Sequence, residues 1–182
     1  MKSSIVVLLC VVLLAGIVSA GLADATGPGL NGRSELMAAG ALVKASAEGE
    51  DINVTLLGAN YGKFVNANIE VQLAAIYARL SAGGSMSAWV LAPGVVYHFL
   101  PRNPSSTVPY VGAGLAYARI AGDGDSESSA KFQYFGGVKL FIGGDYTTAN
   151  KTVFIEYRHT NVELFDTNVK LDMLWTGLSC LF

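Results

Sequence analysis

The sequence predicts an all-β fold, an eight-stranded antiparallel up-and-down transmembrane β-barrel. Eight runs of about 12 residues alternate apolar with polar side chains, which is the period of a β-strand. Short connections rich in Gly, Pro, Asn and Asp separate these runs, as in a meander of hairpins. The polar positions of each run hold only one or two charges, fewer than a water-exposed sheet face normally carries. No helical pattern of any length follows residue 25.

Residues 1–25 are predicted to be a secretory signal peptide. Lys2 precedes an uninterrupted apolar run, Ile5–Val18, and small residues follow that run. Cleavage can follow Ala20 or Ala25, and we expect the second site. The apolar run has 14 residues, fewer than the roughly 20 that a membrane-spanning helix needs. We therefore expect export and not anchoring by this segment.

A flexible Gly- and Pro-rich segment, Thr26–Arg33, is expected next, and residues 34–182 are expected to form the barrel domain. The predicted strands, in chain order, are Glu35–Ser46, Ile52–Phe64, Ile69–Leu80, Ser87–Leu100, Val108–Ala121, Ala130–Ile142, Thr152–Glu163 and Val169–Phe182. In an even-stranded barrel of this kind, the connections after the second, fourth and sixth strands lie on the side that holds both termini.

Parity within each run assigns the two faces of the predicted strands. Tyr134 and Leu140 share the apolar face of the sixth run, and Lys139 lies on its polar face. Ile155 and Glu156 divide the seventh run in the same way. In the fifth run, Gly and Ala fill one parity, which suits a crowded interior.

Strand length and aromatic residues favour lipid as the solvent at the apolar face. Strands of soluble proteins usually have about five or six residues, whereas a tilted membrane-spanning strand needs roughly 9–11. Aromatic residues near the strand ends are expected to form the girdles found at membrane interfaces. They are Tyr61, Phe64, Tyr97, Phe99, Tyr110, Tyr117 and Phe182.

Composition argues against several other functions. The net charge is -2 and no basic run occurs, so nucleic-acid binding is not expected. Of the two cysteines, Cys10 lies in the leader, so Cys180 is expected to be a small apolar strand residue without a disulfide. Glycine pairs such as Gly143 and Gly144 lack the Lys and the following helix of a phosphate-binding loop.

Five segments carry a family resemblance. They are Tyr61–Phe64 at the end of the second run, Val96–Pro101 at the end of the fourth, Pro109–Leu115 at the start of the fifth, and Phe154–Arg158 with Gly177–Phe182 in the last hairpin. In their order and spacing, over essentially the whole mature chain, they resemble the small outer-membrane β-barrel proteins of Gram-negative bacteria, the group of OmpA barrels, OmpX and OmpW.

This resemblance implies an integral outer-membrane protein of a Gram-negative bacterium, with the termini on the periplasmic side. The implied partners are outer-membrane lipids and lipopolysaccharide, and the barrel-assembly machinery during insertion; a monomer without cofactor or metal is expected. The resemblance also implies that Gly177, Leu178, Cys180 and Phe182 form the C-terminal assembly signal, with Cys180 where the family usually has an aromatic or larger residue.

Parity places a set of charges in the lumen: Glu70, Lys139, Glu156 and Arg158. The interior of an eight-stranded barrel is just wide enough for side chains to fill it, and charges buried there must pair. Glu156 and Arg158 lie two apart on one face, so we expect them to form one network with Lys139 of the neighbouring strand. The favoured interpretation is a polar plug, and the alternative is a gated or narrow conduction path.

His159 is the candidate for an enzymatic function. Outer-membrane lipid A deacylases of the PagL type carry a His in the last hairpin, with a Ser two residues later and an acid beyond it. Here Asn161 replaces that Ser, Thr160 points to the opposite strand face, and Glu163 is the nearest acid. Because a nucleophile and its base must be within hydrogen-bond reach, we expect His159 and also His98 to be interfacial strand residues.

Metal binding is not expected from the sequence. Two histidines on remote strands, without clustered Cys, Asp or Glu, do not have the spacing of a metal site. The acidic connection Gly122–Ser129 is expected to be a solvated surface loop, in which Asp123, Asp125 and Glu127 offer at most a weak divalent-ion site.

The leading functional prediction is therefore a structural or envelope-maintaining outer-membrane barrel without catalysis. Two alternatives stay open: an OmpW-like passage for small apolar molecules through a lateral opening, and a lipid-modifying enzyme. A secreted soluble barrel such as a lipocalin is a further alternative, but the Gly-x-Trp of that family's first strand is absent from Glu35–Ser46.

Overall fold

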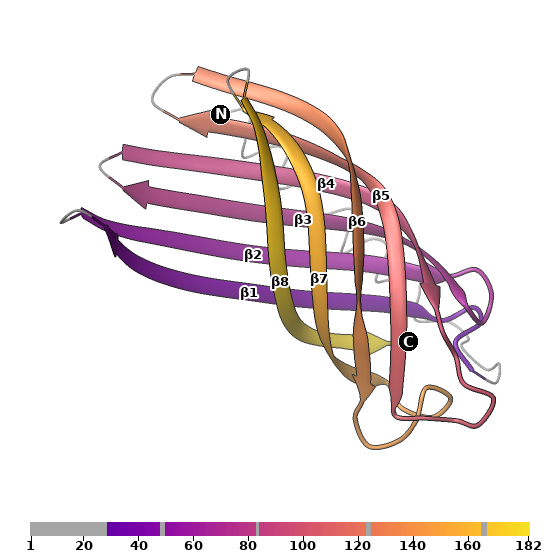
Figure 1. The fold of residues 1–182 in the computed structure, drawn as a ribbon. Coiled ribbons are helices and arrows are strands. Elements are labelled where there is room, and N and C mark those ends of the chain that lie inside the picture. The colour runs from indigo at the N-terminus through magenta and orange to yellow at the C-terminus, as the bar shows by residue number, and fades with distance from the viewer. Residues whose placement is uncertain (1–28, 48–49, 83, 123–124, 165–166) are drawn as a thin grey trace.

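The computed structural model describes residues 29–47, 50–82, 84–122, 125–164 and 167–182, and the predicted leader lies outside these residues. The strands are β1 (Ser34–Ala47), β2 (Glu50–Phe64), β3 (Ile69–Ala82), β4 (Gly84–His98), β5 (Thr107–Gly122), β6 (Asp125–Phe141), β7 (Lys151–Leu164) and β8 (Thr167–Leu181). Each strand pairs antiparallel with the next, and β1 pairs with β8, so the barrel is closed (Figure 1). This confirms the predicted fold class. None of the described residues forms a helix of the length and hydropathy needed to cross a membrane.

The prediction of a surface loop at Gly122–Ser129 is wrong. β6 begins at Asp125, and its pairing with β5 continues as far as Gly122 opposite Asp125. Backbone pairing therefore persists through a serine-rich stretch in which side-chain alternation gives little sign of a strand. The suggested weak ion site is not tested, because Asp123 and the side chains of Asp125 and Glu127 lie outside the described part of the chain.

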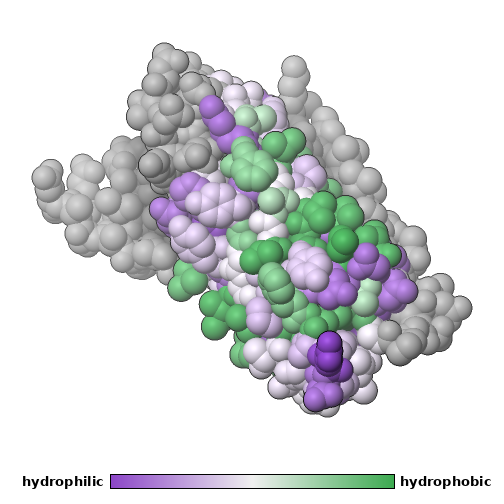
Figure 2. All heavy atoms as spheres, turned by 45° about the vertical axis from the view of Figure 1, so that its right-hand side comes forward, coloured by the Kyte–Doolittle hydropathy of each residue, from purple (hydrophilic) through white to green (hydrophobic). Residues whose placement is uncertain are grey.

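The outer surface carries the apolar parity of the strands. Val71, Tyr134, Leu140 and Ile155 are 41–49% exposed, whereas Lys139 of the opposite parity is 2% exposed. Figure 2 shows hydrophobic residues gathered mainly in the middle of the visible face, with hydrophilic residues at its lower end, at its upper left and at its right. A soluble barrel would have the reverse arrangement, so the parity assignment made from the sequence holds.

The lumen is filled by side chains, and the glycines facing it make room for large ones. A Cβ at Gly112 would lie 2.3 Å from the Phe135 ring. At Gly114 it would lie 2.1 Å from the Pro93 carbonyl oxygen, which is backbone and cannot move aside easily. Ala116 and Ala118, on the same face of β5, are 4% exposed. These contacts explain the small residues noted in this run.

Two of the aromatic residues expected at the membrane interface point inward instead. Phe64 and Tyr110 are 1% and 2% exposed, because each has the lumen parity of its strand. Tyr97, Phe99 and Tyr117 lie on the outer surface, where the first two rings meet edge to face at 5.1 Å. Position near a strand end therefore does not place an aromatic residue in a girdle unless its parity is also outward.

The barrel end that holds Ser34 and Leu181, here called the terminal end, is sealed by an apolar cluster. Its members are Leu30, Phe64, Val108, Phe141, Tyr146, Ala149 and Leu181. Leu30 and Arg33 belong to the segment expected to be flexible, but Leu30 is fully buried and the Arg33 guanidinium donates to the Ala149 carbonyl at 3.0 Å. The described part of that segment is thus packed against the barrel.

The connection between β6 and β7, which contributes Tyr146 and Ala149 to this seal, has its own hydrogen bonds. The Asp145 carboxylate accepts hydrogen bonds from the Thr147 hydroxyl at 2.5 Å and from the Thr147 amide at 2.8 Å. These bonds hold the pKa of the Asp145 carboxyl below its ordinary value. The turn therefore positions the sealing residues through local contacts.

The seam between β1 and β8 is the shortest pairing in the barrel. Five residue pairs join these strands, from Glu35 opposite Leu181 to Ala39 opposite Gly177, whereas the other neighbouring strands share nine to sixteen pairs. Beyond Ala39 and Gly177, each strand remains paired with its other neighbour only. In Figure 1, β1 and β8 run together near the C-terminus and spread apart toward the opposite end.

Candidate functional site: the barrel lumen

The layer of the lumen nearest the terminal end is built around Lys139. Its ammonium group contacts a Glu35 carboxylate oxygen and lies 3.4 Å from a Glu70 oxygen. Glu70 in turn is 2.9 Å from His98 Nε2. The carboxylate of Glu35 also accepts a hydrogen bond from the Ser179 hydroxyl at 2.5 Å. Lys139 is therefore one cation shared by two carboxylates from different strands. All of these side chains are almost completely buried, where an unpaired charge would be costly.

A second charged layer lies farther from the terminal end and is built around Glu156. Arg158 Nε and Nη2 donate to the same Glu156 oxygen at 3.0 and 2.8 Å. The Tyr110 hydroxyl donates to the other carboxylate oxygen at 3.0 Å. The Arg158 guanidinium also lies over the Phe135 ring, 4.6 Å from its centre. Glu156 is therefore held by a cation and a phenol within a wall of aromatic side chains.

The structure places the four sequence-predicted lumen charges inside the barrel, but it does not join them directly. Glu70 lies with Lys139, and Glu156 lies with Arg158, in two separate ion pairs. Tyr110 stands between the layers: its hydroxyl bonds Glu156, and its ring centre is 5.3 Å from the Lys139 ammonium nitrogen.

Sequence reasoning missed Glu35 and assigned His98 to the membrane interface. Both are fully buried in the lumen. The signal that could have found them is parity: His98 shares its strand face with Val96 and Ala92, and Glu35 shares its face with Met37. Their positions at strand ends concealed this, because a polar residue at a strand end is usually solvated.

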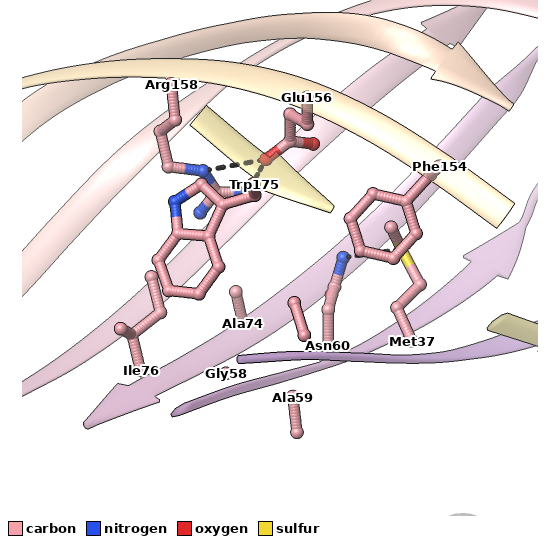
Figure 3. A pocket seen from close by; sticks show the side chains of 11 residues that line it. Met37, Gly58, Ala59, Asn60, Ala74, Ile76, Phe154, Glu156, Arg158 and Trp175 are labelled. Atoms are coloured by element: carbon pink, nitrogen blue, oxygen red, sulfur yellow. Dashed lines mark hydrogen bonds and ion pairs between the residues drawn. The ribbon is translucent and has the colours of Figure 1, made fainter. Parts of the chain in front are cut away.

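These layers leave a cavity of about 40 Å³ on the side away from the terminal end. Met37, Ile76, Phe154 and Trp175 pack together along it, and Asn60, Glu156 and Arg158 supply its polar lining (Figure 3). Trp175 Nε1 and Asn60 Oδ1 are buried without a partner among the described groups. The volume suits a few ordered water molecules, which commonly satisfy such groups, and it is far below the roughly 300–1,000 Å³ of ligand pockets.

His159 lies on the outer surface, on the lipid-facing parity of β7. Its Nδ1 is 2.7 Å from an oxygen of Asp172, and the Tyr157 hydroxyl donates to the same carboxylate at 2.5 Å. The ring of Tyr134 stacks on the imidazole with centres 4.8 Å apart. The acid beside His159 is thus Asp172 of β8, a residue not considered in the sequence analysis, while the side chains of Asn161 and Glu163 lie outside the described residues.

The four residues of the expected assembly signal lie on β8 and just beyond it. Leu178 and Cys180 point outward, and Cys180 is a free thiol on the exposed surface. Gly177 lies where a Cβ would be 2.2 Å from the Ala38 carbonyl oxygen, so a glycine permits the last β1–β8 pairs. Phe182 exchanges two backbone hydrogen bonds with Ser34, at 2.7 and 2.9 Å. Their role in assembly stays a prediction.

No group of three or more His, Cys, Asp or Glu side chains within the described ranges is arranged to hold a metal ion. The ion pairs of the lumen are instead made with Lys139 and Arg158, so the buried carboxylates are already compensated by protein cations. The ion pairs of Lys139 link strands on different sides of the lumen, so their chemical role is to hold the barrel wall together across its interior.

Comparisons with known proteins agree with the fold. The family model described as the outer membrane protein beta-barrel domain matches residues 8–182. A comparison with curated proteins finds no significant match. Among solved structures, the N-terminal β-barrel domain of Pseudomonas aeruginosa OprF has 18% identity and a TM-score of 0.57, over 85% of this chain and 99% of that one.

Two further structures are similar to the same degree. Neisserial surface protein A (NspA) has 21% identity and a TM-score of 0.58, with coverage of 81% of this chain and 95% of that chain. The outer membrane protein OprG from P. aeruginosa has 14% identity and a TM-score of 0.57, with coverage of 87% and 99%. At this level of identity the likeness concerns the fold alone.

Proposed function

Because this chain belongs to the family of outer membrane β-barrel proteins, we propose that it is a structural barrel of the Gram-negative outer membrane, with a closed lumen and no catalysis. In this proposal the terminal end faces the periplasm. The protein contributes to the envelope through its lipid-facing wall and does not carry solutes along its axis.

The observation that carries this proposal is the plug at the terminal end. Lys139, Glu35, Glu70 and His98 fill one cross-section of the lumen, and each is at most 2% exposed. The Phe64 and Tyr110 rings pack against this layer, 5.7 and 5.3 Å from the Lys139 ammonium nitrogen. The apolar cluster around Leu30 and Phe141 closes the barrel below it. A continuous aqueous path would have to break buried ion pairs, each of which is costly to separate.

The test is conductance in planar lipid bilayers. We expect wild-type protein to produce no stable single-channel steps, and Lys139→Ala to leave the baseline unchanged, because Phe64, Tyr110 and the apolar cluster still occlude the axis. Insertion is verified in the same preparation by the gel shift between unboiled and boiled samples, which closed barrels show. Large and stable steps from the wild type would overturn the proposal.

A second candidate function is supported by the β1–β8 seam: a lateral passage for small apolar molecules. The five paired residues of the seam rise only about 12 Å along the barrel axis, whereas the apolar band of such barrels is about 25 Å tall. The strand edges beyond Ala39 and Gly177 would therefore lie partly at the depth of hydrocarbon. Unpaired backbone groups are unfavourable there, so the edges need water or a bound molecule.

Covalent closure of the seam separates the two candidates. A disulfide between cysteines introduced at Gly40 and Thr176, just beyond the last β1–β8 pair, would tie the strands together. Uptake of a small apolar solute into vesicles should fall in this variant if the seam is a passage, and reduction should restore it. A structural barrel shows no solute uptake in either state. Both cysteines are introduced into the Cys180→Ser variant, which by itself provides the background.

A lipid-modifying enzyme is the least supported alternative. His159 and Asp172 form a pair on the lipid-facing surface, but the hydroxyl that accompanies them is the Tyr157 phenol, a poor nucleophile beside a carboxylate. A mass spectrum of lipid A after expression, compared with a His159→Gln variant, checks this alternative. A wild-type-specific loss of an acyl chain would replace the structural proposal.

A further inference from the structure

Two arginines lie on the outer surface of β3 and β5, the strands on either side of β4, immediately beyond the apolar band. On β3 the outward residues run from Val71 and Leu73 through Tyr77 to Arg79. On β5 the outward sequence runs from Val111 and Leu115 through Tyr117 to Arg119. Each strand thus passes from aliphatic to aromatic to guanidinium side chains, the order expected on leaving hydrocarbon for the headgroup layer.

The register brings these residues together around one tryptophan. Arg119 is the cross-strand partner of Trp89 on β4, and Arg79 is the partner of Ser87, two residues from that tryptophan. The Trp89 ring packs on Tyr77 with centres 4.6 Å apart. Strand spacing and rise then place the two arginine Cα atoms about 12 Å apart, a span that two extended guanidinium side chains can close onto a single headgroup.

No side chain in the described part of the chain compensates the charge of this surface. Arg79 and Arg119 are exposed, and neither makes an ion pair or hydrogen bond with another described side chain. No described outward side chain of β3, β4 or β5 is acidic. The β7–β8 flank differs, since Asp172 stands there beside His159. Among the described outward side chains, the guanidinium groups of β3 and β5 therefore have no acidic neighbour, whereas the β7–β8 flank has one.

We propose that Arg79, Arg119 and Trp89 form a docking site for the phosphorylated headgroup of a glycolipid in the outer leaflet. The proposal rests on the outer-membrane placement given above. Planar guanidinium groups recognise phosphate oxygens with paired charge-assisted hydrogen bonds. Arg79 and Arg119 lie roughly 25 Å along the barrel axis from the periplasmic strand ends. The phosphates of the outer leaflet lie at this height. The Trp89 and Tyr77 rings pack beside the headgroup at the interface.

Native mass spectrometry of the detergent-solubilised barrel, titrated with lipid A, tests the site. We expect Arg79→Gln and Arg119→Gln each to weaken binding about fivefold, as removal of one cation near a phosphate-rich surface predicts, and the double variant to weaken it more. Arg79→Lys with Arg119→Lys should recover part of the loss. The matched control is Arg102→Gln, which removes an exposed guanidinium from the opposite end of the barrel and should leave binding unchanged.

Three outcomes would overturn the site: equal binding by wild type and the double variant, an equal loss in Arg102→Gln, or displacement of lipid A by inorganic phosphate at matched concentration. The last would mean that free phosphate, and not the lipid, is the ligand. Phosphatidylcholine, whose phosphate is accompanied by its own cation, should not be retained. The heat-dependent gel shift is recorded for every variant. Its absence in the wild type would count against the barrel proposal itself, whereas a normal shift without lipid A binding would count against the site alone.

Discussion

Arg158 is the residue on which the second charged layer depends. It is 4% exposed and supplies both guanidinium hydrogen bonds that compensate Glu156. We expect Arg158→Ala to lower the free energy of unfolding by about 3–5 kcal/mol, because a carboxylate is left buried without its cation. Urea unfolding in lipid vesicles measures the change. Planar-bilayer recordings should still show no steps, because the Lys139 layer is intact.

The matched control removes both members of the pair. In Glu156→Gln with Arg158→Met, no charge is left uncompensated, and a side chain of similar length keeps contact with the Phe135 ring. This double variant should be more stable than Arg158→Ala. A double variant as unstable as the single one would contradict the uncompensated Glu156 carboxylate as the cause of the loss.

Gly114 is a residue at which the close approach of two strands requires glycine. A Cβ there would lie 2.1 Å from the Pro93 carbonyl oxygen and 2.8 Å from Gly94 Cα, both backbone atoms. We expect Gly114→Ala to reduce stability by about 1–3 kcal/mol through overpacking. Gly40→Ala is the control, since its Cβ would meet the end of the Leu57 side chain at 3.3 Å. Thermal unfolding followed by gel shift compares the two; similar midpoints would contradict the close approach.

At the scale of elements, the seam divides β1 and β8 into two parts. The pairs between Glu35–Ala39 and Gly177–Leu181 hold the strands together at the terminal end, and Gly40–Ala47 and Thr167–Thr176 continue without them. Amide groups that point toward a missing neighbour have no backbone acceptor, and such edges open with a low free energy.

Hydrogen exchange monitored by NMR in nanodiscs measures this directly. We expect the alternate amides of Gly40–Ala47 and Thr167–Thr176 that face the seam to exchange much faster than those of Glu35–Ala39. The amides of β5, which pairs along its length with β6, serve as the reference. Uniform protection along β1 and β8 would mean that the seam is closed in the bilayer, and it would remove the support for a lateral passage.

At the scale of the whole molecule, the fold could be predicted because its determinants are periodic. A period of two fixes which side chain faces which solvent, and the Gly, Asn and Asp connections fix where the chain reverses. The eight strands and the inward position of Glu70, Lys139, Glu156 and Arg158 follow from these two signals. Parity fails as a boundary marker where both faces are polar, as at the start of β6.

The arrangement within the lumen could not be predicted, because parity says which face a residue occupies but not its height or its partner across the barrel. Lys139 and Glu35 are 104 residues apart in sequence and meet only after closure. Phe64 and Tyr110 depart from the expected girdle for a related reason: both lie near strand ends, but their parity points them into the lumen. The same residues prove to pack against Lys139 and seal the plug.

Which solvent touches the outer wall can be tested with two isoleucines of equal exposure. Ile155 is 49% exposed within β7, and Ile142 is 50% exposed one residue beyond the end of β6. We expect Ile155→Arg to destabilise the folded barrel by about 2–4 kcal/mol and Ile142→Arg by about 0–1, because the cost of an arginine depends on its depth in hydrocarbon. Urea unfolding in phospholipid vesicles gives both values. In water the two substitutions would be equally mild, so equal small effects would contradict a lipid-facing wall, and with it the barrel's place in the membrane.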